Sequence, residues 1–459
     1  MLFPTLEFIL FFGVVLALNA VAFGLAAWRK ALLLVASYCF YAAWDARFLL
    51  LMLAVSATAY LGGLAVTRTR YRKAALWLSL IALLGLLGFF KYFNFFALSL
   101  QQLLEGVGLG RDWVWISVIL PVGISFYIFQ AISYVIDVDR GIVPARRNPA
   151  DIFLYISFFP QLVAGPIVRA SDFLPQIDAP RVPTAPIRAE AVVLILIGLF
   201  KKMVVANYLA VSVVDPFYAL PDGQDALTAT AAFLGYGIQI YCDFSGYSDI
   251  AIGVALLLGY RFPANFRQPY RARSLREFWQ RWHISLSTWI RDYLYIPLGG
   301  NTGGPRRQAS VLIGTMTLAG LWHGAGWNFL IWGFVHGAGL AMERRWGASK
   351  SWLGTLFVVL FVFALWVPFR AESFGEMVQV FAAFARLDGF AAVALSPFGL
   401  ALIAVGFAMN ALPERGLSGA VGLLARLPAI AQALVLIAGV WLCFATAQEG
   451  MAPFIYFQF

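Results

Sequence analysis

The chain has 459 residues, of which 61% are hydrophobic and 12% are charged, and its formal net charge is +10. A soluble globular domain carries about 25% charged and about 45–50% apolar residues, so this composition excludes a soluble fold. The basic residues form short clusters between apolar segments, such as 68–73 and 306–307. This pattern is typical of cytoplasmic loops beside anionic lipid, so we expect a protein that contacts membrane lipid and binds no nucleic acid.

The N-terminal third is a series of apolar segments of roughly membrane-spanning length. The candidate spans are residues 8–27, 31–44, 48–66, 75–100 and 114–136. The first has no basic residue before it and no small-residue cleavage site, so we expect a retained span and not a signal peptide. Arg29 and Lys30 follow it, which predicts an outside N-terminus and a cytoplasmic first loop. We expect the helices of residues 1–140 to serve as a scaffold.

Polar residues enter the apolar segments in the middle of the chain, which we expect to be a catalytic core over residues 150–345. Its candidate spans are residues 152–169, 190–213, 228–259 and 309–342. Segment 261–307 is instead rich in arginine and aromatic residues, which indicates amphipathic or re-entrant helices. Irregular backbone at membrane depth persists only where it is buried in protein or lines a wet cavity, so we expect a cavity here.

The C-terminal part, residues 350–459, continues the bundle. Its candidate spans are residues 353–369, 391–411 and 428–447. We therefore predict a single all-α membrane domain over residues 1–459, with about eleven transmembrane helices plus re-entrant or amphipathic helices.

The three histidines of the chain are His283, His323 and His336. A histidine is costly in hydrocarbon and suits acid–base chemistry near neutral pH, so each is a functional candidate. His283 precedes Gly303, in a glycine-rich turn, by 20 residues and His323 follows it by 20, so helical flanks would bring the two rings level. His336 lies on another face about 20 Å further along a continuous helix, and joins them only if the helix breaks at Gly324 or Gly326. Otherwise it is a packed helix histidine, and both interpretations stay open.

Each of the first two histidines has a distinctive neighbourhood. Trp322 and the glycines beside His323 would wall a narrow apolar slot, or would only pack helices. Arg281 and Trp282 precede His283, and this arginine could bind phosphate groups or face lipid headgroups.

A second polar stretch, residues 239–249, contains Asp243, Ser245 and Asp249. Carboxylates within a span are costly, which favours ion pairs or a supporting role over direct chemistry. Nucleotide-binding glycine motifs, cysteine-rich or H-E-x-x-H metal motifs and the G-x-S-x-G elbow are absent from the sequence. We therefore expect no metal and no bound cofactor.

The sequences RWHISLS at 281–287 and RDYLYIPLGGN at 291–301 resemble the signature of the membrane-bound O-acyltransferase family. The similarity is to its alginate O-acetyltransferase membrane subunits and their peptidoglycan and cellulose relatives. Further matching stretches are residues 120–127, 159–167, 241–249, 321–327, 366–372 and 454–459. Pro368 departs from the family pattern, where an aromatic residue is expected, and this affects local helix geometry.

The resemblance implies a bundle shaped as two opposed funnels that meet in a central tunnel. It implies that His323 is the essential histidine and His283 the second motif histidine. It also implies a bacterial inner-membrane location, a cytoplasmic acetyl donor and a periplasmic SGNH-type acetyltransferase that passes the group to a polysaccharide acceptor. The candidate donor-binding or supporting residues are Arg281, Trp282, Arg291, Trp322, Asn328, Asp243, Ser245 and Asp249.

We therefore predict an O-acetyltransferase that takes an acetyl group from acetyl-CoA, with His323 as a neutral general base. Acetylation of His323 itself remains an alternative route. Peptidoglycan or cellulose O-acetylation, or D-alanyl transfer to teichoic acid, would use the same chemistry. A transporter or flippase is the non-enzyme alternative, although the sequence shows no internal repeat.

Overall fold

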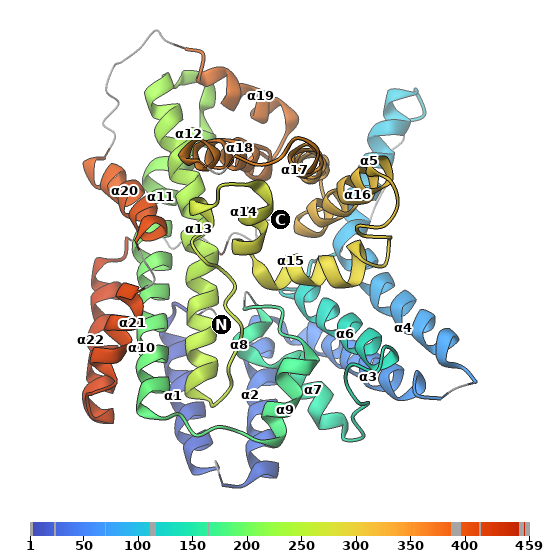
Figure 1. Ribbon diagram of the computed structural model, residues 1–459, viewed down its shortest axis with the longest axis vertical. Coiled ribbons are helices and arrows are strands. Elements are labelled where there is room, and N and C mark those ends of the chain that lie inside the picture. Colours follow the sequence, from blue (N-terminus) through green and yellow to red (C-terminus); the bar gives the residue numbers. More distant parts are fainter. Residues whose placement is uncertain are drawn as a thin grey trace. The chain divides into compact units, whose positions relative to one another are not determined.

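The structure is a computed structural model that describes residues 3–22, 24–68, 70–110, 116–163, 165–349, 351–386, 396–412, 415–448 and 454. Throughout these ranges the regular elements are helices, which confirms the predicted all-α class (Figure 1). The chain forms two compact units, Met1–Val182 with Leu258–Phe262, and Pro183–Leu257 with Pro263–Phe459.

Within its described residues, the first unit contains nine α-helices. They are α1 (Leu6–Val21), α2 (Ala26–Asp45), α3 (Leu49–Ala65), α4 (Arg72–Leu87), α5 (Phe93–Gly106), α6 (Ile124–Asp139), α7 (Pro149–Ser157), α8 (Phe159–Leu162) and α9 (Ala170–Asp178). A π-helical turn, Gly88–Tyr92, joins α4 to α5, and a 3-10 turn, Ala46–Phe48, precedes α3.

The predicted span at residues 152–169 was wrong. Helix α7 ends at Ser157, and Phe158 leaves the helical region with φ −55° and ψ 110°. The next helix, α8, has four residues and carries a proline in its first turn. The residues of both helices are mostly apolar and buried, so their hydropathy resembles that of one membrane span. They form short helices inside the unit instead.

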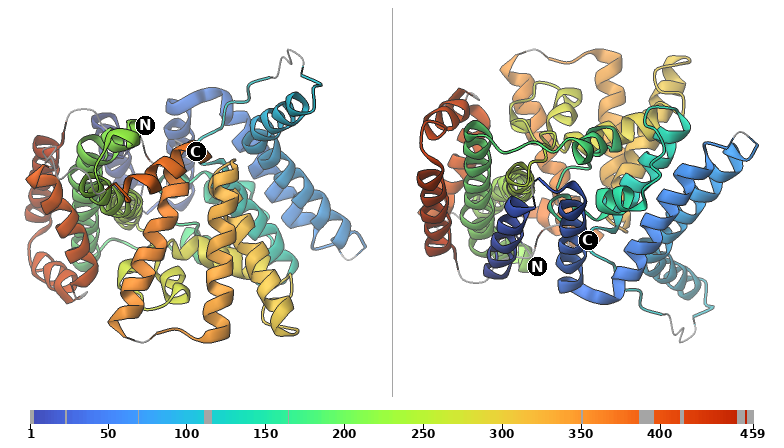
Figure 2. Two further views of the ribbon diagram at one scale, coloured as in Figure 1. Left: turned by 90° about the horizontal axis from the view of Figure 1, so that it is seen from above. Right: turned by 90° about the horizontal axis from the view of Figure 1, so that it is seen from below.

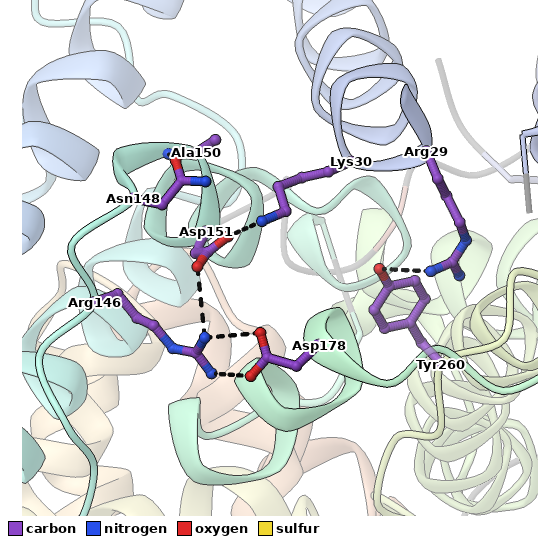
Figure 3. Close-up of polar contacts among 8 residues, drawn as sticks. All are labelled: Arg29, Lys30, Arg146, Asn148, Ala150, Asp151, Asp178 and Tyr260. Atoms are coloured by element: carbon purple, nitrogen blue, oxygen red, sulfur yellow. Dashed lines mark hydrogen bonds and ion pairs between the residues drawn. The ribbon is translucent and has the colours of Figure 1, made fainter. Parts of the chain in front are cut away.

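Ion pairs and hydrogen bonds connect several segments of the first unit (Figure 3). Asp151 pairs with Lys30 and lies 3.6 Å from Arg146, which donates two hydrogen bonds of 2.8 and 2.7 Å to Asp178. Arg29 is 3% exposed and donates to the Tyr260 hydroxyl at 3.4 Å. Arg29 and Lys30 thus lie within α2 and not in a loop after the first span, and the orientation inferred from them stays a prediction.

The second unit is built around α13 (Ala226–Leu257), a helix of 32 residues. Helix α10 (Ala185–Leu199) runs beside it, and α21 (Arg415–Leu424) and α22 (Ala429–Thr446) lie on the other side of α10 (Figure 1). The close approach requires glycine, because a Cβ on Gly246 would stand 2.7 Å from the Gly198 carbonyl oxygen.

The remaining elements of this unit include those that form the candidate site. The helices are α11 (Asn207–Leu209), α12 (Asp215–Ala219), α14 (Leu275–Arg281), α15 (Ile284–Ile290), α16 (Pro305–His323), α17 (Trp327–Trp346), α18 (Trp352–Arg370), α19 (Phe374–Ala383) and α20 (Pro397–Ala411). The π-helical segments are Phe200–Ala206, Ala210–Val214 and Arg291–Tyr295, and the 3-10 turns are Pro221–Gly223 and Pro269–Arg271.

Segment 309–342 is a hairpin of two helices and not one continuous helix. Helix α16 ends at His323, Gly324 and Gly326 are extended with φ −150° and −165°, and α17 begins at Trp327. Helices α16, α17 and α18 are neighbours in the unit (Figure 2). The break left open by the sequence is therefore present, and it turns the chain back on itself after His323.

Close packing of this hairpin depends on Gly333. A Cβ there would stand 2.3 Å from the Met316 carbonyl oxygen, so Gly333→Leu should destabilise the protein by about 1–3 kcal/mol through overpacking. Thermal unfolding of the detergent-solubilised variants measures this. Gly314→Leu on α16 is the control, because nothing lies within 4 Å of its added Cβ. Equal unfolding temperatures for both variants would contradict the packing argument.

Several helices have the length and composition of membrane spans. Within the described ranges five qualify, namely Ala26–Ala65, Arg72–Gly106, Ala226–Leu257, Trp352–Arg370 and Ala429–Thr446. The bent pair Pro397–Ala411 and Gly416–Leu424 would be a sixth. The protein is thus a polytopic membrane protein, as predicted, and the count of about eleven spans stays a prediction. Part of the predicted span 391–411 and most of the matching stretch 454–459 lie outside the described residues.

Candidate active site

His283 lies in the turn between α14 and α15. Its backbone is left-handed, with φ 42° and ψ 56°, and its side chain is fully buried. The imidazole ring packs edge-on against Phe244 of α13, with 4.6 Å between centroids, and lies 6.0 Å from Trp322 of α16. The turn thus places the ring between two helices that are far apart in the sequence.

His323 is the last residue of α16 and is 2% exposed. Its ring centroid lies 5.0 Å from that of Trp332, 5.5 Å from Phe369 and 6.4 Å from His283. The prediction that the first two histidines lie level is confirmed. The flanks are not two regular helices, however, because α14, α15 and a π-helical segment replace the expected first one.

A cavity of about 750 Å³ reaches His323. It is lined by residues of α14, α15, the π-helical segment Arg291–Tyr295, α16 and α17, which confirms the predicted cavity beside segment 261–307. Arg276, Arg291 and Arg344 line it as well, and the Arg291 side chain is 59% exposed. The cavity therefore joins exposed guanidinium groups to a buried imidazole.

The last turn of α17 organises the exposed part of this cavity. The Arg344 guanidinium donates to the Asn301 side-chain oxygen at 2.6 Å, and Tyr295 donates to the same oxygen at 2.9 Å. Glu343 accepts hydrogen bonds from the backbone N–H groups of Leu275 and Arg276, at 2.5 and 3.1 Å. Sequence reasoning missed Glu343 and Arg344, and their only signal was a charged pair at the end of an apolar segment.

Arg281 and Trp282, which precede His283, differ from the arginines that line the cavity. Arg281 donates to Glu277 at 2.9 Å and to the Arg267 carbonyl at 3.1 Å, and it is not among the residues lining the cavity. Trp282 is 1% exposed and stacks on Phe278, with 5.6 Å between centroids. Both therefore contact protein groups, whereas Arg291 faces the cavity.

The carboxylates of α13 form ion pairs with the π-helical segment Phe200–Ala206. Asp243 pairs with Lys202, both nearly fully buried, and Asp249 pairs with Lys201 at 2.7 Å. Ser245, between them, is buried. Asn328 lies apart from this group and donates to the Ala371 carbonyl at 2.8 Å. The structure thus brings Asp243 together with Lys202 and Asp249 together with Lys201.

His336 is buried on α17 among aromatic rings. The nearest centroids are those of Trp332 at 4.7 Å, Trp279 at 5.1 Å and Phe361 at 5.5 Å. Within the described part of the chain, neither ring nitrogen has a hydrogen-bond partner. Trp332 stands between His336 and His323, so this arrangement favours a packed helix histidine.

Comparison with known proteins agrees with this architecture. Residues 74–357 match the model of the membrane-bound O-acyltransferase family. A protein of Pseudomonas putida named as a probable alginate O-acetylase is 39% identical over 469 residues, covering 94% of this chain and 95% of its own. One of the same name from Azotobacter vinelandii is 43% identical over 367 residues, covering 78% and 73%. A peptidoglycan O-acetyltransferase of Helicobacter pylori is 35% identical over 397 residues, covering 78% and 74%. The chain therefore belongs to the membrane-bound O-acyltransferase family and is an O-acyltransferase.

Proposed function

We propose that this protein takes an acetyl group from cytoplasmic acetyl-CoA and passes it across the bacterial inner membrane for O-acetylation of an extracytoplasmic polysaccharide. A periplasmic SGNH-type acetyltransferase would be the partner that completes the transfer. The observation that carries the proposal is the cavity that connects three arginines to His323. It fits a long donor with phosphates at one end and a thioester at the other.

His323 would act as the general base of the reaction. One ring nitrogen accepts the proton of an incoming hydroxyl group, and the hydroxyl oxygen attacks the thioester carbonyl carbon. The carbon–sulfur bond then breaks, and the thiolate takes the proton back from the imidazolium as the free thiol leaves. Such a base contributes about 10²–10⁴-fold in rate, and positioning in a closed site supplies much of the remainder.

His283, which lies beside His323 but is not among the residues lining the cavity, would orient the donor or polarise its carbonyl oxygen as a neutral hydrogen-bond donor. Burial lowers the pKa of His283 to about 3, so its ring stays uncharged at physiological pH. Its ring centroid lies 6.4 Å from that of His323, so the two rings are close enough to act on the same bound group. Acetylation of His323 itself is the alternative route, and trapping of an acyl-imidazole would distinguish the two.

The acceptor we propose is alginate, on the names of the relatives that are 39% and 43% identical. Peptidoglycan is the second candidate, because the 35% identical relative carries that name and 78% of this chain is covered. D-Alanyl transfer to teichoic acid has less support, since a relative with that name is 30% identical over 50% of the chain. Membranes supplied with labelled acetyl-CoA and each polymer would show which one gains base-labile label.

Release of free thiol separates an acyltransferase from a transporter or flippase. Proteoliposomes that hold the protein and labelled acetyl-CoA should release one thiol for each acetyl group that reaches the acceptor. Movement of solute without thiol release would overturn the proposed function.

Arg344 is proposed to hold the donor phosphates together with Arg276 and Arg291. A hydrogen bond to a charged group contributes about 1.5–3 kcal/mol, so Arg344→Ala should raise the KM for acetyl-CoA about 10–100-fold with little change in kcat. Initial rates over a range of acetyl-CoA concentrations measure this. Arg345→Ala is the control, because Arg345 lies in the same last turn of α17 but does not line the cavity. An equal rise in KM for both variants would contradict a specific phosphate contact.

A further inference from the structure

The backbone at His283 adopts a conformation that non-glycine residues rarely hold. Across the described ranges, two non-glycine residues have a positive φ, Gln268 at 48° and His283 at 42°. Such a conformation persists only where surrounding contacts determine it, and it concentrates at functional sites. Contacts with neighbouring segments must therefore hold the His283 turn in this conformation.

The segment 265–267 lies antiparallel to the His283 turn. The Arg267 N–H donates to the Arg281 carbonyl at 2.9 Å, before the turn, and the Ile284 N–H donates to the Asn265 carbonyl at 2.9 Å, after it. The turn is thus fixed by backbone hydrogen bonds on both sides of His283.

The Asn265 side chain adds a second set of bonds. Its Oδ1 accepts from the Ser285 backbone N–H at 3.2 Å and from the Ser285 hydroxyl at 2.9 Å. Its Nδ2 donates to the Ser248 hydroxyl of α13 at 3.1 Å, and the residue is 1% exposed. The N–H groups of Ile284 and Ser285 begin α15, where a helix offers them no partner of its own. Asn265 therefore caps α15 from a distant segment and links it to α13.

This link joins α13, which contacts the His283 ring, to α15, which begins directly after His283. Helix α13 carries Ser248 and also Phe244, whose ring centroid lies 4.6 Å from that of His283. Helix α15 begins directly after His283. The buried Asn265 amide thus determines the position of the His283 turn relative to Phe244 on α13.

We infer that Asn265 is a positioning residue that holds the His283 imidazole in its reactive place through Ser285 and Ser248. The inference rests on the role proposed for His283, and Asn265 itself touches no reacting atom. A displacement of about 1 Å at a catalytic group can lower the rate about 10²-fold. Loss of the amide should therefore lower kcat and leave donor binding nearly unchanged, because Asn265 does not line the cavity.

The test compares Asn265→Ala with Asn265→Asp in the full-length protein. Asn265→Ala should lower kcat about 10–100-fold with the KM for acetyl-CoA unchanged within about twofold. Asn265→Asp keeps an oxygen that accepts from Ser285 but loses the N–H that donates to Ser248, so it should recover part of this loss. Because the chain has three histidines, ¹⁵N ring signals of histidine-labelled protein can be assigned by single substitutions. The His283 signals should shift in Asn265→Ala and the His336 signals should not.

Gln432→Ala controls for general loss of packing. Gln432 is a buried amide, 2% exposed, that donates to the Leu424 and Leu427 carbonyls at 3.1 Å, remote from the cavity residues. It should lower the unfolding temperature and keep kcat and the His283 signals.

Three results would overturn the inference. The first is an unchanged kcat in folded Asn265→Ala, and the second is unmoved His283 signals in that variant. The third is an Asn265→Asp protein that folds but recovers nothing. If His283→Ala is itself fully active, the role proposed for His283 fails and this inference falls with it. An inactive His283→Ala beside a fully active Asn265→Ala overturns the inference alone.

Discussion

Replacement of His323 by alanine is expected to lower kcat for acetyl transfer by about 10²–10⁴-fold, because the general base is lost. The ring lies at the buried end of the cavity, and Trp332 and Phe369 pack 5.0 and 5.5 Å from it. Thiol release from acetyl-CoA by purified variant and parent protein, at matched amounts of folded protein, measures the loss.

His336→Phe is the matched control for this substitution. His336 is equally buried in the same group of aromatic rings, and no residue of the described chain bonds to its ring nitrogens. Phenylalanine has a similar shape and suits an aromatic environment, so kcat should stay within about threefold of the parent value. A His323→Ala protein that keeps the parent kcat, or a His336→Phe protein that loses as much activity as His323→Ala, would contradict the assignment.

Removal of the Asp243 carboxylate is expected to destabilise the protein by about 3–5 kcal/mol, because it breaks a buried ion pair with the Lys202 ammonium by removing one partner. The two side chains are 4% and 3% exposed and belong to α13 and the adjacent π-helical segment. Asp243→Ala should therefore show a large drop in the free energy of unfolding, measured by denaturant titration in detergent micelles.

Two comparisons isolate the charge effect. The double variant Asp243→Leu with Lys202→Met removes both charges and should recover most of the lost stability. Asp222→Ala breaks the exposed pair with Arg386, in which Asp222 is 61% exposed, and should cost less than about 1 kcal/mol. If Asp243→Ala is no less stable than Asp222→Ala, the buried pair does not stabilise this unit.

Much of the fold could be predicted from the sequence where one helix forms from one apolar segment. Candidate segments 228–259, 353–369 and 428–447 appear as α13, α18 and α22. The prediction failed at residues 152–169, and it left the break in 309–342 open, because a hydropathy average cannot detect a local break. Phe158 in one and the extended Gly324 in the other end the helix through backbone conformation, which apolar composition does not reveal.

The sequence predicted those parts of the candidate site that contain rare residue types. His283 and His323 stood out because imidazoles are scarce in an apolar chain, and the turn between them gave their approximate register. Arg344 and Asn265 were not predictable, because their roles depend on contacts across long sequence separations. Arg344 reaches Asn301 only because α17 folds back along α16, and Asn265 reaches Ser285 only because segment 265–267 runs beside the His283 turn.

The most direct test of the account is an experimental structure of the protein with a thioether analogue of acetyl-CoA, which binds but cannot release its acyl group. We expect the carbonyl group of the analogue beside the His323 side chain, so that a hydroxyl group hydrogen-bonded to the ring nitrogen can reach the carbonyl carbon. We also expect the phosphates against Arg276, Arg291 and Arg344. An analogue bound elsewhere, with His323 remote from its carbonyl group, would contradict the central claim that acyl transfer occurs at the end of this cavity.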